Sequence, residues 1–98
     1  MKTFAYIGRD GPRGLELRKT VRDQHLAHLS SLSESGRVLF GGPLRDASGE
    51  PCGSLVILKA EDLEAAGAIA HGDPYLTEGV FAELEVFETV AVFPEDPD

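Results

Sequence analysis

The segments of this 98-residue chain that are predicted to be strands carry apolar side chains at consecutive positions rather than at every second one. Successive side chains of a strand point to opposite faces of its sheet. Within residues 3–7, the two aromatic side chains would therefore lie on one face and Ala5 and Ile7 on the other. Residues 55–58, Leu-Val-Ile-Leu, follow the same pattern. A sheet that is apolar on both faces needs a covering layer on each face, which restricts the folds open to the chain.

The positions of Gly and Pro, which interrupt helices and strands, and of residues that favour helices predict the order of the elements. Residues 15–35 contain no Gly or Pro and predict a long helix, which Gly36 ends. Residues 61–71 predict a second, alanine-rich helix. Strands are predicted at residues 3–7, 38–40, 55–58 and 80–92, with a turn at residues 41–43 and a polar loop at residues 46–53. This β-α-β-β-α-β order predicts an α+β, ferredoxin-like fold with a four-stranded antiparallel sheet.

The two predicted helices cover only one face of the predicted sheet. A second sheet from another copy of the chain would cover the other apolar face, so we predict a homodimer whose sheets stack face to face. The last strand carries Glu83, Glu85 and Glu88, and charged side chains of this kind protect an outer strand from further pairing. We therefore expect that strand at an edge of the sheet.

Length and charge limit the kind of protein further. Residues 1–93 suffice for one domain with one core, and residues 94–98 form an acidic C-terminal tail. Nine Lys and Arg residues stand against seventeen Asp and Glu residues, for a formal net charge of −8. Binding to nucleic acid depends on clustered cations that contact phosphates. This composition therefore argues against a nucleic acid partner.

The remaining composition points to the cytoplasm. The longest apolar run is about five residues, far short of a membrane span, and no signal peptide is visible at the start of the chain. Cys52 is the only cysteine, which excludes an internal disulfide and a cysteine-based zinc site. We therefore expect a cytoplasmic protein that does not bind to membranes.

A histidine on the apolar face of the first helix is the most informative polar residue. At about 100° per residue, His25 lies on the same side as Val21 and Leu29, with Arg18 and Arg22 beside it. A buried polar group without a partner costs roughly 1–3 kcal/mol. Either a carboxylate or a water-filled pocket should therefore lie beneath this helix. The alternative is a core histidine whose neighbouring arginines reach past it to solvent.

Asp73 is the candidate carboxylate. An Asp before Pro74 is the residue expected at a helix N-cap. The same side chain is predicted to reach His25, fix its tautomer and raise its basicity. Capping and pairing use different lone pairs and are compatible.

The other polar candidates give weaker signals. We expect His28 and His71 to be structural or exposed, and three histidines without paired ligand spacing predict no metal site. The Gly41-Gly42-Pro43 segment is either a simple turn or a place where backbone approaches a ligand. Ser54 either donates into the pocket or satisfies a strand end, and Cys52 has no neighbouring base that would make it a nucleophile.

Four short motifs in series resemble the YciI-like (YCII-related) family. Residues 22–29, Arg-Asp-Gln-His-Leu-Ala-His-Leu, are similar to its R-x-x-H-L-x-x-L pattern, and residues 36–43 to its G-x-[LV]-L-x-x-G-P pattern. Gly53-Ser54 at a strand and residues 73–75 with 79–80 are similar to its later motifs. The resemblance implies a dimeric α+β barrel, whose relatives include muconolactone isomerase and a dehydrochlorinase. It also implies a His–Asp pair at His25 and Asp73.

Two functions remain open from the sequence. The first is a small-molecule enzyme of isomerase or lyase type, dehydrochlorinase-like, in which His25 moves a proton and Asp73 orients it. Arg22 would hold an anionic group of the substrate, and the rest of the predicted substrate-binding set is Gly42, Pro43, Ser54 and Tyr75. No metal, nucleotide or flavin motif is present, so no cofactor is expected. The second is a non-catalytic module that binds a ligand or supports assembly.

Overall fold

The structure, a computed structural model, describes residues 1–94. Its elements are, in order, β1 (Lys2–Asp10), α1 (Gly14–Glu34), β2 (Val38–Arg45), β3 (Pro51–Ala60), α2 (Leu63–His71), α3 (Pro74–Thr77) and β4 (Phe81–Thr89). The predicted β-α-β-β-α-β order is confirmed, with the short helix α3 added before the last strand. Residues 95–98 of the predicted acidic tail lie outside the described residues, and the single domain over residues 1–93 stays a prediction.

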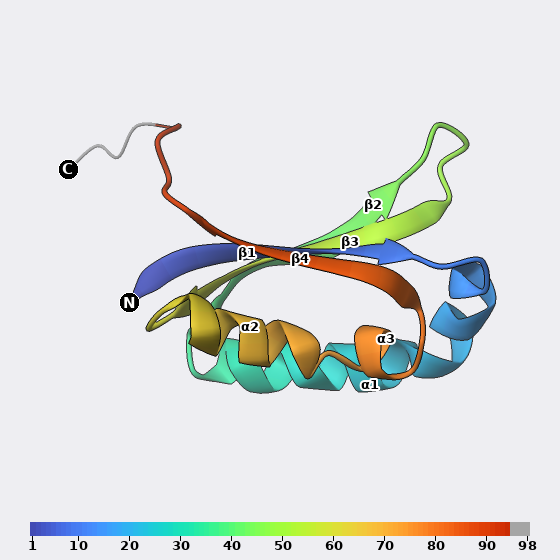
Figure 1. The fold of residues 1–98 in the computed structure, drawn as a ribbon, viewed down its shortest axis with the longest axis horizontal. Coiled ribbons are helices and arrows are strands. Elements are labelled where there is room, and N and C mark those ends of the chain that lie inside the picture. Colours follow the sequence, from blue (N-terminus) through green and yellow to red (C-terminus); the bar gives the residue numbers. More distant parts are fainter. Residues whose placement is uncertain (95–98) are drawn as a thin grey trace.

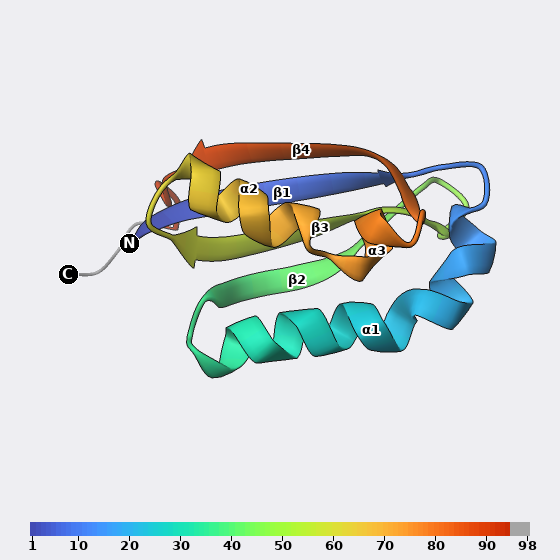
Figure 2. The ribbon, with the colours of Figure 1, turned by 60° about the horizontal axis from the view of Figure 1, so that its bottom comes forward.

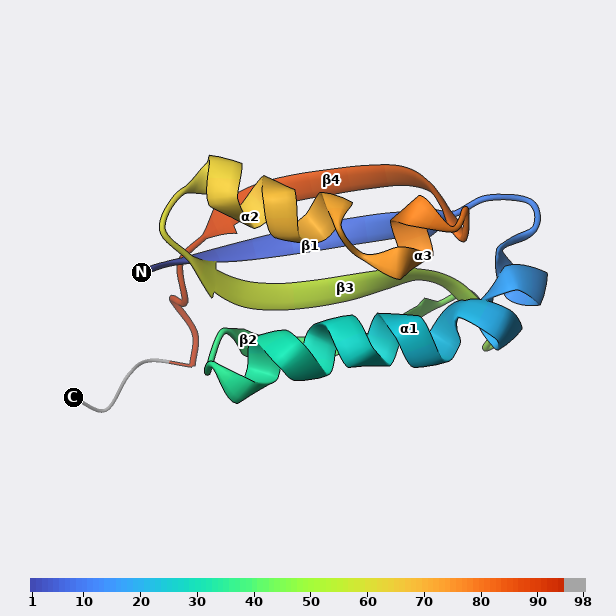
Figure 3. The same ribbon diagram turned by 90° about the horizontal axis from the view of Figure 1, so that it is seen from below.

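The four strands form one antiparallel sheet in the order β2-β3-β1-β4. All three helices lie on the same face of this sheet, as Figure 1 shows. β2 and β4 are the two edge strands, which confirms the outer position expected for the glutamate-rich last strand. Helix α1 runs along the β2 side of the sheet, and α2 crosses the other strands (Figure 2 and Figure 3).

The core lies between the sheet and the helices. Phe4 and Tyr6 of β1 pair across the sheet with Leu58 and Val56 of β3, and all four side chains are buried. The small Ala66 lets α2 pack closely onto these side chains. A second cluster joins α1, α3 and the start of β4 through Val21, Tyr75, Val80 and Phe81. This second cluster lies around the site described below.

The opposite face of the sheet is also apolar. Ala5, Ile7, Leu55 and Ile57 alternate with the core residues of their strands and are only partly buried. Phe40 at the β2 edge and Phe87 at the β4 edge are 52% and 49% exposed. No helix or strand within residues 1–94 covers this face (Figure 1). We call it the outer face.

The structure corrects three predicted boundaries. Residues 41–43 do not form a turn but continue β2, since Gly41, Gly42 and Pro43 pair with Val56, Leu55 and Ser54. Proline is tolerated there because β2 is an edge strand. The predicted polar loop at residues 46–53 is shorter, because β3 already begins at Pro51. The last strand spans Phe81–Thr89 rather than residues 80–92.

Candidate functional site

The imidazole of His25 lies at the inner side of α1, where this helix faces α3. The residue is 7% exposed. Its ring stacks on the ring of Tyr75, with centroids 3.8 Å apart and planes inclined by 4°. Tyr75 in turn meets Phe81 edge to face at 5.6 Å. These aromatic contacts fix the plane of the His25 ring.

Asp73 lies directly behind this histidine. His25 Nδ1 is 2.8 Å from Asp73 Oδ1, and the Asp73 side chain has no exposed surface. The same oxygen accepts a hydrogen bond from the backbone N–H of Tyr75 at 2.9 Å and caps α3. The predicted contact between the pair and the predicted cap are both confirmed. Because an ionised carboxylate only accepts hydrogen bonds, His25 Nδ1 carries the proton and Nε2 is left free.

Tyr6 completes the support of Asp73 and was missed by the sequence analysis. Its hydroxyl donates to Asp73 Oδ2 at 2.6 Å, and the tyrosine is fully buried. The two residues are 67 positions apart. The sequence places Tyr6 on the apolar face of a strand, but no local pattern indicates which carboxylate its hydroxyl meets.

The environment keeps Asp73 ionised. Burial alone would raise its pKa, but hydrogen bonds from His25, Tyr6 and the Tyr75 backbone outweigh burial, and the pKa lies below its ordinary value. Burial, the Asp73 charge and their hydrogen bond raise the pKa of the Tyr6 hydroxyl. Tyr6 therefore remains a proton donor to a negatively charged Asp73 at neutral pH.

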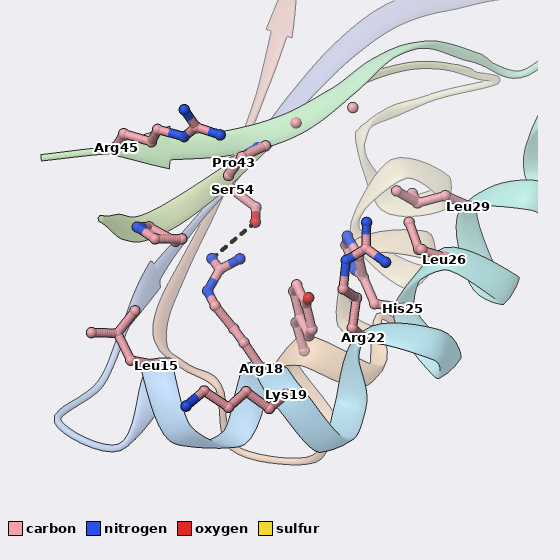
Figure 4. Close-up of a pocket in the computed structure, with 14 residues that line it drawn as sticks. Leu15, Arg18, Lys19, Arg22, His25, Leu26, Leu29, Pro43, Arg45 and Ser54 are labelled. Atoms are coloured by element: carbon pink, nitrogen blue, oxygen red, sulfur yellow. Dashed lines mark hydrogen bonds between the residues drawn. The ribbon is translucent and has the colours of Figure 1, made fainter. Parts of the chain in front are cut away.

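A pocket of about 540 Å³ opens between α1 and the β2–β3 side of the sheet (Figure 4). Six of the seven predicted site residues line it: Arg22, His25, Gly42, Pro43, Ser54 and Tyr75. The seventh, Asp73, lies behind His25 and is not part of the lining. The carboxylate and the pocket, which were alternatives in the sequence analysis, are thus both present beneath α1.

Arg18 connects the pocket wall to the sheet and was not among the predicted site residues. Its guanidinium makes two hydrogen bonds to Asp10, at 2.7 and 2.9 Å. It also donates to the Gly53 carbonyl at 2.8 Å and to Ser54 Oγ at 3.1 Å. Although burial acts to lower the pKa of Arg18, the Asp10 carboxylate raises it above its ordinary value. Ser54 accepts from Arg18, so its hydroxyl hydrogen remains available to a ligand.

The pocket lining is strongly cationic. Figure 4 shows Arg18, Lys19 and Arg22 on α1 and Arg45 on β2. The lining contains no Asp or Glu. Lys19 and Arg45 were not predicted as site residues, because Lys19 lies away from the apolar face of α1 and Arg45 lies on a strand. Such a lining favours the binding of a ligand that carries an anionic group.

The remaining candidates lie outside the pocket. His71 was expected to be either structural or exposed, and it is exposed. Its Nδ1 is 2.8 Å from the Gly67 carbonyl. His28 Nε2 is buried and has no hydrogen-bond partner within the described residues. Cys52 is a free, exposed thiol. Residues 1–94 hold no group of three His, Cys, Asp or Glu side chains that could bind a metal ion. None of their helices is long and apolar enough to cross a membrane.

The sequence-family model of the YCII-related domain matches residues 2–90 of the chain. Protein YciI of Escherichia coli O6:H1 and an uncharacterized protein of Haemophilus influenzae are each 38% identical over 96 residues, which is 92% of this chain and 98% of either relative.

Solved structures are similar over most of the chain as well. One is the 5-chloro-2-hydroxyhydroquinone dehydrochlorinase TftG from Burkholderia phenoliruptrix, in complex with 2,5-dihydroxybenzoquinone. It is 28% identical with a TM-score of 0.77, over 87% of this chain and 90% of TftG. PA3566 from Pseudomonas aeruginosa is 12% identical with a TM-score of 0.55, over 92% of each chain, and supports the fold alone.

Proposed function

Because this chain belongs to the YCII-related domain family, we propose that it is an enzyme that moves a proton on a small anionic molecule. The observation that carries this proposal is the 2.8 Å contact between His25 Nδ1 and the buried Asp73. His25 itself lines a cationic pocket. With Nδ1 engaged, Nε2 is the nitrogen that meets a ligand. The reaction class is isomerase or lyase.

His25 is the proton acceptor in this scheme. Its Nε2 takes a proton from a carbon or oxygen of the substrate, and the ionised Asp73 stabilises the imidazolium that forms. In an isomerisation, the same ring returns the proton to a different substrate atom. In an elimination, the C–H bond and the bond to the leaving group break, a double bond forms, and the leaving group departs with its electron pair.

Arg22 holds an anionic group of the substrate next to this base. It precedes His25 by three residues, so the two side chains project from adjacent turns of α1. The Ser54 hydroxyl donates a hydrogen bond, and Gly42, Pro43 and Tyr75 form the walls. Gly42 contributes backbone to the pocket, since a Cβ at this position would point at the ring of Phe40.

TftG supports a cyclic, hydroxylated substrate. It is described as a dehydrochlorinase of a chlorinated hydroxyhydroquinone, and its structure holds a dihydroxybenzoquinone. At 28% identity over 87% of this chain, it is a reasonable source of test compounds. A compound of this kind is deprotonated readily and suits Arg22 and His25.

The test is chloride release from 5-chloro-2-hydroxyhydroquinone, together with binding of 2,5-dihydroxybenzoquinone. We expect the wild type to release chloride and His25→Gln to do so at least about 100-fold more slowly, because proton transfer by a positioned side chain contributes about 10²–10⁴-fold. Arg22→Gln should weaken quinone binding. Equal chloride release by wild type and His25→Gln would contradict the proposal.

A non-catalytic ligand-binding module is the second candidate. The burial of His25 and its stacking on Tyr75 favour it, since both also suit a histidine that only packs. Binding of the quinone without any turnover, combined with a loss of several kcal/mol of stability in His25→Ala, would support this candidate instead.

We also propose that two copies of the chain stack through their outer faces. Ile7, Leu55, Ile57 and Phe40 present apolar surface there, and a two-fold axis would place this surface against itself. Arg9 and Glu85, which form an ion pair at 3.3 Å, supply both signs of charge at the margin. The occupant of the outer face is therefore a second copy.

A further inference from the structure

The pocket carries more positive charge than one anionic group requires. Arg18 is already neutralised by its two hydrogen bonds to Asp10. Among residues 1–94, Lys19, Arg22 and Arg45 make neither an ion pair nor a side-chain hydrogen bond. Three uncompensated cations thus line one pocket, in a chain whose formal net charge is −8.

These three cations lie at two ends of the pocket. Arg22 lies beside His25 at one end (Figure 4). Lys19 precedes Arg22 by three residues, about 4.5 Å along the helix axis at 1.5 Å per residue, and the two side chains point apart in Figure 4. Lys19 projects from α1 and Arg45 from β2, both on the side of the pocket away from His25 (Figure 4). The far end is therefore bounded by cations on two walls.

We propose that the ligand of this site is a compact dianion with its two acidic groups at opposite ends of a rigid core. This inference rests on the proposed function and names its substrate class. One acidic group binds Arg22 next to His25, and the other binds between Lys19 and Arg45. A single negative charge would leave one set of like charges uncompensated, whereas a dianion compensates both.

Two aromatic acids with the same ring separate one charge from two. Benzene-1,4-dicarboxylate carries acidic groups at opposite ends of its ring, and benzoate carries one. Each is titrated into the full chain at low salt, and binding is followed by NMR of backbone amides at Arg22 and Arg45. We expect the dicarboxylate to bind at least about fivefold more tightly than benzoate, as one further partly exposed charge pair allows.

Variants show whether the second charge binds where the structure indicates. Lys19→Gln and Arg45→Gln should each lower the affinity for the dicarboxylate toward that of benzoate, while benzoate affinity changes less than about twofold. Arg22→Gln should weaken both acids. Arg37→Gln makes the same change in net charge outside the pocket lining and should leave the preference intact.

Three outcomes would overturn the inference. They are equal affinities for the two acids, no binding of either acid at millimolar concentration, and a preference for the dicarboxylate that survives in both Lys19→Gln and Arg45→Gln. The proposed reaction is judged separately, by the chloride release of His25→Gln. Equal affinities together with a His25-dependent reaction would therefore reject the dianion and keep the enzyme.

Discussion

Asp73 accepts hydrogen bonds from three donors that come from three different parts of the chain. His25 belongs to α1, Tyr6 to β1, and the Tyr75 N–H to the first turn of α3. A carboxylate with no exposed surface depends on such donors, because it has no water to solvate it. The position of the His25 ring is consequently tied to the sheet as well as to its own helix.

Tyr6→Phe removes one of these donors without changing the shape of the core. We expect a loss of roughly 1–3 kcal/mol in the free energy of unfolding, because Asp73 Oδ2 becomes a buried acceptor without a partner. The pKa of Asp73 should also rise. Urea denaturation measures the first effect, and ¹³C NMR titration of the carboxyl carbon measures the second.

Phe4→Leu is the matched control for this variant. Phe4 lies on the same strand and face, is equally buried, and makes no contact with Asp73 through a hydrogen bond. The control should lose stability through packing but leave the titration of Asp73 unchanged. An Asp73 carboxyl that titrates identically in the wild type and in Tyr6→Phe would show that Tyr6 does not support the site.

The lowered pKa of Asp73 also makes stability depend on pH. The pKa of Asp73 is lower in the folded chain than in the unfolded chain, where it is about 3.9. Ionised Asp73 therefore stabilises the fold at a pH above about 3.9, and this contribution is lost as the pH falls through the folded pKa. Asp73→Asn cannot titrate. The difference in unfolding free energy between wild type and Asp73→Asn should therefore shrink as pH falls below about 4. Parallel stability curves from pH 7 to pH 2 would contradict this account.

At the scale of helices and strands, Arg18 connects α1 to the sheet. Its guanidinium contacts Asp10 at the end of β1 and the Gly53 carbonyl and Ser54 hydroxyl of β3. The Arg18 and Asp10 side chains are only 11% and 8% exposed. Because breaking a buried pair leaves an unpaired charge, each partner should matter more than a surface ion pair does.

A double-mutant cycle with Arg18→Gln and Asp10→Asn measures this connection. We expect each single variant to lose about 3 kcal/mol of stability and the double variant to lose clearly less than the sum, with a coupling of at least about 1 kcal/mol. Arg13→Gln with Glu16→Gln is the control, since this pair is 67% and 70% exposed and should show little coupling. Additive losses in the Arg18 cycle would mean that the pair does not hold α1.

Local pattern was sufficient for most elements and for part of the site. The Gly- and Pro-free run that forms α1 and the apolar runs of β1 and β3 were predictable, and so was the pairing of His25 with Asp73. The length of β2 was not, because glycine and proline indicate a turn unless the partner strand is known. Tyr6 and Arg45 join the site, and Arg18 meets its partners on the sheet, only through sheet register and helix placement, which involve distant residues.

At the scale of the whole molecule, the outer face is the surface through which we expect two copies of the chain to associate. Ile57 lies near its centre on β3, next to Ala5 of β1 and Phe40 of β2. We expect Ile57→Glu to convert a dimer into a monomer, because two stacked sheets would bury this charge against itself. Light scattering after size-exclusion chromatography measures the mass, which should fall by half.

Leu63→Glu is the control for this change. Leu63 is 52% exposed at the start of α2, on the opposite side of the sheet, so its variant should keep the mass of the wild type. A wild-type chain that runs as a monomer at high concentration would reject the stacking of outer faces. A dimer that survives Ile57→Glu would place the interface elsewhere.

The tautomer of His25 tests the central claim most directly. In protein labelled with ¹⁵N-histidine, at a pH where the imidazole is neutral, NMR shift and coupling patterns distinguish the protonated ring nitrogen from the bare one. The contact with an ionised Asp73 predicts a proton on Nδ1 and a bare Nε2 available to the substrate. A proton found on Nε2, with Nδ1 bare, would contradict the account, since neither Nδ1 nor the carboxylate could then donate.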